Sequence, residues 1–184
     1  VSYTGTGSLA TVGHGLGVAP ELVIIKDRTT ASTSWSVGTT AGVDFTYVAY
    51  LNATNAFATD SAYFNNADPS DTVFTINTNN YVNDTDDYVA YCFASIEGYS
   101  KVGSYEGNAD ADGTFIYLGF KPEFFLVKDI DAVESWAMWD GTREPYNKLS
   151  KKISPDSNVA EYTANTTTYA IDFLSNGVKL RSSY

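Results

Sequence analysis

The sequence predicts an all-β protein, an antiparallel and jelly-roll-like β-sandwich made of two related halves. Apolar residues do not recur at helical spacing over any sustained stretch. Short runs rich in Val, Ile, Phe, Tyr and Thr alternate instead with Gly, Asn, Asp and Ser, which is the pattern of strands and turns. The chain also repeats itself, and this repeat predicts the division into halves.

The repeat has a nearly constant offset. Tyr3-Thr4-Gly5 returns as Tyr105-Glu106-Gly107, and residues 17–27 return as 119–129, both 102 positions later (105 − 3 and 119 − 17). Trp35 then matches Trp136 at an offset of 101, and Phe74 matches Phe173 at an offset of 99. We therefore expect one β-sandwich repeat in residues 1–104 and a second in residues 105–184.

Each half is expected to contain several short strands joined by turns. In the first half the strand pattern falls on residues 22–26, 34–37, 47–52, 73–76, 88–94 and 100–105. In the second half it falls on residues 114–118, 124–128, 136–139, 170–174 and 177–180. The runs at 22–26 and 124–128 are apolar at consecutive positions, which is typical of strands covered on both faces, so both should lie centrally in their sheets.

The second half contains no counterpart of residues 88–94. A sheet that lacks a strand exposes unpaired backbone groups and apolar surface. Either the sequence ends before the repeat does, or another chain supplies the strand. The second alternative describes a self-assembling extracellular filament subunit, completed by strand donation, and its subunit-contact candidates follow the last matched motif: Gly177, Val178, Lys179, Leu180 and Arg181.

Composition excludes several classes of partner. The 184 residues have a formal net charge of −11, which disfavours nucleic acid and anionic membrane surfaces because both attract positive charge. No run is long and apolar enough for a membrane helix. Cys92 is the only cysteine, so an intrachain disulfide cannot form, and its place in a predicted strand indicates a packed thiol.

No catalytic constellation is evident, and we expect neither an enzyme nor a cofactor. His14 is the only histidine, and nothing around it resembles a nucleophile motif. Two acidic loops are weak calcium candidates, and no metal site is expected from them. Asn108, Asp110 and Asp112 resemble the first half of a calcium loop, but Gly119 stands where the closing Glu should be. Asp84 and Asp86 form the other cluster.

Aromatic residues could form a sugar-stacking surface. Trp35 and Trp136 occupy equivalent positions of the repeat, which favours a place in the core. Trp139 and Tyr146 lie outside the matched positions, and they are the candidates for glycan contact in a carbohydrate-binding module. Asn52, Asn83 and Asn165 fit the glycosylation acceptor pattern, as expected by chance in a chain rich in Asn and Thr.

Three stretches carry a family resemblance: HGLGVAPELVIIK (residues 14–26), YVAYCFASIEGYSKVGSYEGN (88–108) and DFLSNGVKLR (172–181). They resemble a duplicated β-rich domain of tailed-bacteriophage proteins, especially marine phages and cyanophages, found in tail fibres and other virion surface proteins. The resemblance implies a non-enzymatic structural component at a virion surface or in another extracellular assembly, where it could face a receptor. Its partners would be copies of itself and other virion or assembly proteins, and a cell-surface glycan is left open.

Overall fold

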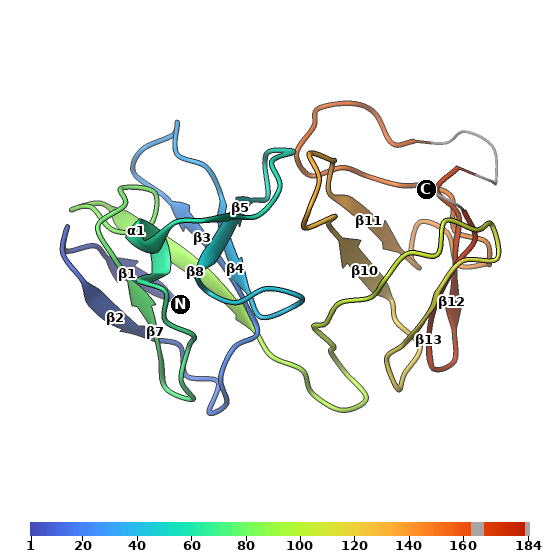
Figure 1. The fold of residues 1–184 in the computed structure, drawn as a ribbon, viewed down its shortest axis with the longest axis horizontal. Coiled ribbons are helices and arrows are strands. Elements are labelled where there is room, and N and C mark those ends of the chain that lie inside the picture. The colour runs from blue at the N-terminus through green and yellow to red at the C-terminus, as the bar shows by residue number, and fades with distance from the viewer. Residues whose placement is uncertain (163–167, 183–184) are drawn as a thin grey trace.

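The computed structural model describes residues 1–162 and 168–182, and almost all of its regular structure is β (Figure 1). The single helix described, α1 (Ser61–Phe64), is one turn long, and the side chain of Asp60 caps it by accepting from the Ala62 amide. The prediction of an all-β, antiparallel sandwich is confirmed. Within the described part of the chain, no helix has the length and apolarity needed to cross a membrane.

The first half forms a sandwich of two sheets. Its larger sheet has the strand order β1-β8-β3-β4-β5-β6, with every neighbouring pair antiparallel, and β2 pairs with β7 to form the smaller sheet. The strands are β1 (Ser2–Thr4), β2 (Ala10–Gly13), β3 (Leu22–Asp27), β4 (Ser36–Thr39), β5 (Tyr47–Tyr50), β6 (Ala58–Thr59), β7 (Val73–Ile76) and β8 (Asp87–Phe93).

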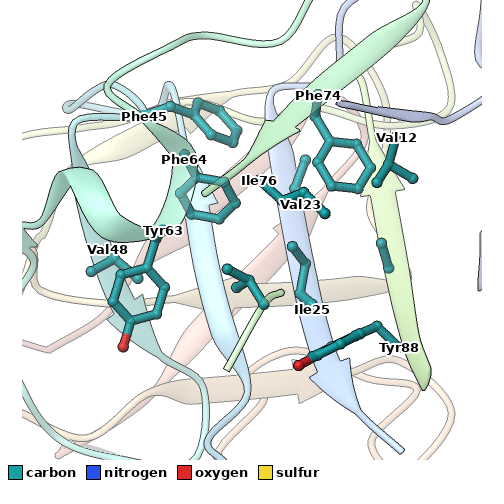
Figure 2. Close-up of a cluster of buried hydrophobic side chains, with 12 residues drawn as sticks. Val12, Val23, Ile25, Phe45, Val48, Tyr63, Phe64, Phe74, Ile76 and Tyr88 are labelled. Carbon is teal, nitrogen blue, oxygen red and sulfur yellow. The ribbon is translucent and has the colours of Figure 1, made fainter. Parts of the chain in front are cut away.

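Aromatic and branched side chains fill the space between these sheets (Figure 2). Val23 and Ile25 of β3 point into this core, where Phe74 of β7 and Phe64 of α1 meet them. Ile24, between them in sequence, faces the opposite side and belongs to another apolar cluster. The consecutive apolar residues of β3 are therefore explained by two buried faces, and the predicted central position of this strand is confirmed.

The described part of the second half contains five strands in two smaller sheets. β10 pairs with β11, and a three-stranded sheet has the order β12-β13-β9. The bounds are β9 (Phe115–Tyr117), β10 (Phe124–Val127), β11 (Ala137–Asp140), β12 (Ile171–Leu174) and β13 (Gly177–Leu180). Trp139, Phe173 and Val178 are central to the core between the two sheets.

The two halves share local contacts at the offset of the repeat. The Asp27 side chain accepts from the Thr29 and Thr30 amides, and the Asp129 side chain accepts in the same way from the Asp131 and Ala132 amides. In register, Val23 of β3 lies opposite Gly38 of β4, and their counterparts Phe125 and Trp139 lie opposite each other in β10 and β11. These contacts support the predicted duplication. That the two halves arose from one copied unit stays a prediction.

Two expectations about individual strands are wrong. Residues 100–105 form no strand, and Ser100 makes only an isolated bridge to Ile96. β10 is not central, because β11 is its only strand partner among the described residues.

An interface cluster joins the halves. It consists of the buried residues Ile24, Val37, Ala49 and Trp136, with Leu22, Trp35, Leu51, Phe57 and Leu126 packed against them. Trp136 belongs to the second half, but its indole Nε1 donates to the Tyr50 carbonyl of the first half at 2.9 Å. The Phe57 amide also donates to the Ile130 carbonyl at 3.1 Å. The outer face of the larger sheet is therefore partly covered by the second half.

Buried tyrosines make the fold sensitive to alkali. The Tyr88 hydroxyl donates to the Asn80 carbonyl at 2.7 Å and accepts from the Asp84 amide. Burial raises the pKa of Tyr88 to about 12, and burial followed by the nearby Tyr88 raises the pKa of Tyr3. Since the folded chain favours the neutral phenols, their stabilisation is intact below the ordinary tyrosine pKa of about 10 and is lost as pH rises through the folded values.

We therefore expect alkaline unfolding to coincide with ionisation of these tyrosines above about pH 10. Tyrosinate absorbance and circular dichroism should be followed during the same titration. Full ionisation of every tyrosine near the ordinary pKa, with the β-sheet signal intact, would contradict this expectation.

Candidate interaction site

The two aromatic residues expected to contact glycan lie in different environments. Trp139 is only 5% exposed, and its Nε1 donates to the Tyr169 carbonyl at 3.1 Å. The prediction that it lies at the surface is wrong, because its position on β11 directs the ring into the second core, where it stacks on Phe125. Tyr146 is 84% exposed as predicted. The sugar-stacking surface expected from these two residues does not form.

A different aromatic surface lies on the outer face of the larger sheet. It consists of Trp35, Tyr91 and Phe93, and we call it the aromatic surface. The rings of Trp35 and Tyr91 are stacked with centroids 6.3 Å apart. Tyr91 and Phe93 are 46% and 45% exposed, on the same face of β8 because they are two residues apart. This surface continues from the interface cluster, against which Trp35 also packs.

Sequence reasoning missed the aromatic surface because it assigned residues 88–94 to a buried strand and Trp35 to the core. The alternation along β8 was the available signal. Tyr88 and Ala90 are fully buried, whereas Tyr91 and Phe93 are exposed, so the aromatic residues at odd positions belong to the other face. Trp136 confirms the core prediction, but its ring fills the space between the halves rather than the core of its own half.

The predicted subunit-contact residues do not form an open edge. Gly177, Val178, Lys179 and Leu180 form β13, which is paired on one side with β12 and on the other with β9. Arg181 follows, and its guanidinium Nε lies 2.6 Å from a carboxylate oxygen of the buried Asp172. These residues are therefore internal contacts of the second half, and the prediction that they await a partner is wrong.

The open edge lies at β10 instead. In β10, Phe124 is 56% exposed, and Phe125, Leu126 and Val127 are half-buried. The Glu123 carbonyl accepts a hydrogen bond from the amide of Gly141, which lies just beyond the end of β11. Hydrogen-bonded and non-hydrogen-bonded residue pairs alternate along an antiparallel ladder, so every second residue from Glu123 onward is hydrogen-bonded to β11. The amides of Phe124, Leu126 and Lys128 consequently point to the side of β10 that carries no strand among the described residues.

The acidic loops use their oxygens in local contacts. Asn108 accepts from the Asp110 amide, and Asp110 accepts from the Asp112 amide, as in a hydrogen-bonded turn. Asp112 pairs with Lys179 at 2.9 Å, and the hydrogen bond from Lys179 lowers the pKa of Asp112. In the other loop, Asp84 accepts from the Thr85 amide and Asp86 accepts from the Thr30 hydroxyl at 2.9 Å. Nowhere in residues 1–162 and 168–182 do three or more His, Cys, Asp or Glu side chains gather as metal ligands would.

His14 and Cys92 occupy structural positions. His14 is buried, with Nε2 3.1 Å from the Ser70 carbonyl and Nδ1 accepting from the Leu16 amide, so the ring holds the loop after β2 in place. Cys92 lies on β8 opposite Val23 and packs against the first core. Burial raises the pKa of the Cys92 thiol, which disfavours the reactive thiolate.

One glycosylation candidate is a structural residue. Asn83 is 1% exposed, and its side chain accepts from the Thr6 amide at 2.7 Å and donates to the Ser8 carbonyl at 2.6 Å. It fixes the loop between β1 and β2, so the acceptor pattern at this position has no bearing on glycosylation of the folded chain. Asn52 is exposed, and Asn165 lies outside the described residues.

A polar hollow lies where the halves meet. Its lining includes Asp44, Tyr47 and Phe57 from the first half, and Ile130 and Asp131 from the second. No Lys or Arg is among its lining residues, so it offers no cation to a phosphate or another anion. Neither Asp44 nor Asp131 joins a group of metal-ligating side chains within the described residues.

Together these features define an all-β protein of two packed sandwich halves. One half has an exposed aromatic surface, and the other has a strand edge that no described strand covers. Over residues 1–184 the sequence matches the family described as Domain of unknown function (DUF7483), and the chain belongs to this family. No curated protein and no solved structure matches it.

Proposed function

We propose that this chain is a non-enzymatic structural component of a phage particle or another extracellular assembly, placed at the surface of that assembly. The observation that carries the proposal is the continuity between the interface cluster and the exposed aromatic surface on one sheet face. The covered part of that face holds the two halves together, and the uncovered part offers the same kind of surface to a neighbouring protein. The sequence resemblance to virion surface proteins supports the same role.

The packing between the halves suits rigid display. Trp136 is almost completely buried against Ile24, Val37 and Ala49, and its indole is fixed by the hydrogen bond to Tyr50. A relative movement of the halves would break these contacts together. Rigid units lose little conformational entropy when they assemble, and many copies in one particle convert weak contacts into avidity.

The aromatic surface suits contact with a protein neighbour. Tyr and Trp are enriched among the residues that dominate the energy of protein interfaces, and Phe is also enriched in interface cores. The partners would be copies of this chain or other assembly proteins. The charge of −11 favours neither nucleic acid nor an anionic membrane as a partner.

The proposal predicts that the chain is found in purified particles and that its aromatic surface is needed there. Particles from the virus or organism that encodes the chain should be labelled by antibodies against it in electron microscopy. Replacing both Tyr91 and Phe93 by serine should reduce incorporation by about tenfold or more, because removal of central aromatic residues from an interface costs about 2 kcal/mol or more each.

Tyr146→Ser is the matched control, since Tyr146 is a more exposed aromatic residue that lies outside the aromatic surface. It should leave incorporation unchanged. The folded state of each variant is checked by its unfolding midpoint before incorporation is measured. If the chain is missing from purified particles and from every extracellular fraction, the proposal fails.

A further inference from the structure

Two buried side-chain oxygens of the first half have no hydrogen-bond partner among the described residues. They are Asp27 Oδ2 and Ser36 Oγ. Asp27 is 2% exposed and Ser36 is fully buried, so bulk solvent does not reach either atom. Buried polar groups are almost always hydrogen-bonded, because an unpaired one loses its hydration without compensation. Each of these oxygens therefore needs a partner that the described side chains and backbone do not supply.

The register of the strands places both side chains on one face of the larger sheet. Ile25 of β3 lies opposite Ser36 of β4, and Ile25 points into the first core (Figure 2), so Ser36 does the same. Asp27 follows Ile25 by two residues and lies opposite the buried Tyr88 of β8, so it points the same way. Asp27 and Ser36 are thus diagonal neighbours on adjacent strands, a relation in which residues lie about 7–8 Å apart. Their side chains shorten this gap to a span that two hydrogen bonds in series, each of about 2.8 Å, can bridge.

The other oxygen of the Asp27 carboxylate is already engaged. Oδ1 accepts from the Thr29 amide at 2.8 Å and from the Thr30 amide at 2.9 Å. These two bonds fix the carboxylate, so Oδ2 cannot turn toward another donor without breaking them. The missing partner must donate to Oδ2, bond to the Ser36 hydroxyl and fit inside a packed core. Water meets all three conditions, and buried waters typically bind polar groups that lack another partner.

The neighbours of Ser36 favour a small ligand at this place. Ser36 lies opposite Ile25 on one side and opposite Tyr50 on the other. Both neighbours have longer side chains than serine and pack in the first core. They therefore extend past the Ser36 hydroxyl and leave the level next to the sheet to a smaller group.

The second half lacks both features of this site. Ala137 takes the place of Ser36, 101 positions later (137 − 36), and has no hydroxyl. Asp129 takes the place of Asp27, 102 positions later (129 − 27), and accepts from two following amides in the same way, but it is exposed to solvent. The buried carboxylate and the serine thus occur together in one half and are absent together from the other, as expected of two groups that serve one ligand.

We propose that one water molecule is bound inside the first half, where it donates to Asp27 Oδ2 and is hydrogen-bonded to the Ser36 hydroxyl. These two residues stand at the two ends of the loop between β3 and β4, residues 28–35. The water therefore joins both ends of the loop that carries Trp35, and it helps to hold Trp35 in the aromatic surface.

A crystal structure of the chain, at a resolution that shows ordered waters, tests the site directly. One water should lie within about 3.2 Å of both Asp27 Oδ2 and Ser36 Oγ. Ser36→Ala removes one of its two side-chain partners. We expect this variant to lose the water from the electron density and to shift the unfolding equilibrium toward the unfolded state about fivefold, the usual effect of losing one hydrogen bond.

Ser32→Ala is the matched control, because it removes the same hydroxyl from an exposed residue of the same loop. It should leave the unfolding equilibrium within about twofold of the unchanged protein. The proposal is overturned if no water lies between the two oxygens, if Oδ2 bonds directly to a protein group, or if the two alanine variants shift the equilibrium equally. The crystal structure of the unchanged protein decides the first two points whether or not the variants fold. None of these measurements involves particles, so the site and the proposed function can fail independently.

Discussion

Replacing Trp136 by alanine is expected to lower the free energy of unfolding by about 3–5 kcal/mol, the usual cost of removing a buried tryptophan. Trp136 is 5% exposed and lies in the interface cluster with Ile24, Val37 and Ala49. Its removal leaves a cavity between the halves and also takes away one donor to the Tyr50 carbonyl, which still accepts from the Ala53 amide. Because the lost contacts are between halves, the two halves should unfold less cooperatively in the variant. Chemical denaturation followed by tyrosine and tryptophan fluorescence measures both effects.

Trp35→Ala is the matched control for this experiment. Trp35 occupies the equivalent position of the repeat, 101 residues earlier (136 − 35), but it is half-buried and stacks on the exposed Tyr91. Its loss should therefore cost only about 1 kcal/mol. Equal losses for the two variants would show that Trp136 does not join the halves as the structure indicates.

Gly177→Ala is expected to destabilise the second half by about 3 kcal/mol, at the upper end of the usual cost of overpacking. A Cβ on Gly177 would lie 2.1 Å from the Ile116 carbonyl oxygen of β9 and 3.0 Å from the ring of Phe115. A backbone carbonyl cannot rotate away as a side chain can, so β9 and β13 would have to separate. The measurement is the unfolding free energy, together with hydrogen exchange at amides of the β9–β13 pair.

Gly107→Ala is the control substitution, since no atom lies within 4 Å of a Cβ placed there and Gly107 is not among the glycines with positive φ. Its effect should be within about 0.5 kcal/mol of zero. If Gly177→Ala likewise leaves the unfolding free energy unchanged, and amide hydrogen exchange in β9 and β13 is also unchanged, then β9 does not approach β13 as closely as the structure places it.

Much of the fold was predictable from the sequence because strand formation leaves a local signature. The bounds of β7 and β13 match the predicted ranges, and the central position of β3 follows from its consecutive apolar residues. The short strands β1, β2 and β6 carry little apolar periodicity and were not predicted. Residues 100–105 carry the pattern without forming a strand, and Ser100 makes only an isolated bridge to Ile96.

The candidate site was less predictable, because exposure depends on what packs against a residue. Trp139 was expected at the surface because it has no tryptophan counterpart in the first half, yet it is buried beside Phe125 in the second core. The sequence predicted an unpaired edge in the second half at residues 177–181. Among the described residues the open edge belongs to β10 instead, because residues 177–180 pair with strands on both sides.

By itself, the sequence determined that this chain is β-rich, strongly acidic and internally repeated, because these properties belong to composition, residue alternation and spacing. Only the tertiary structure decided that Trp136 is buried between the halves while Trp35 stays partly exposed. It also decided that β3 has two strand neighbours and that β10 has one among the described residues. The physical reason is that identical local patterns form identical strands, whereas burial and edge pairing depend on residues far away in the sequence.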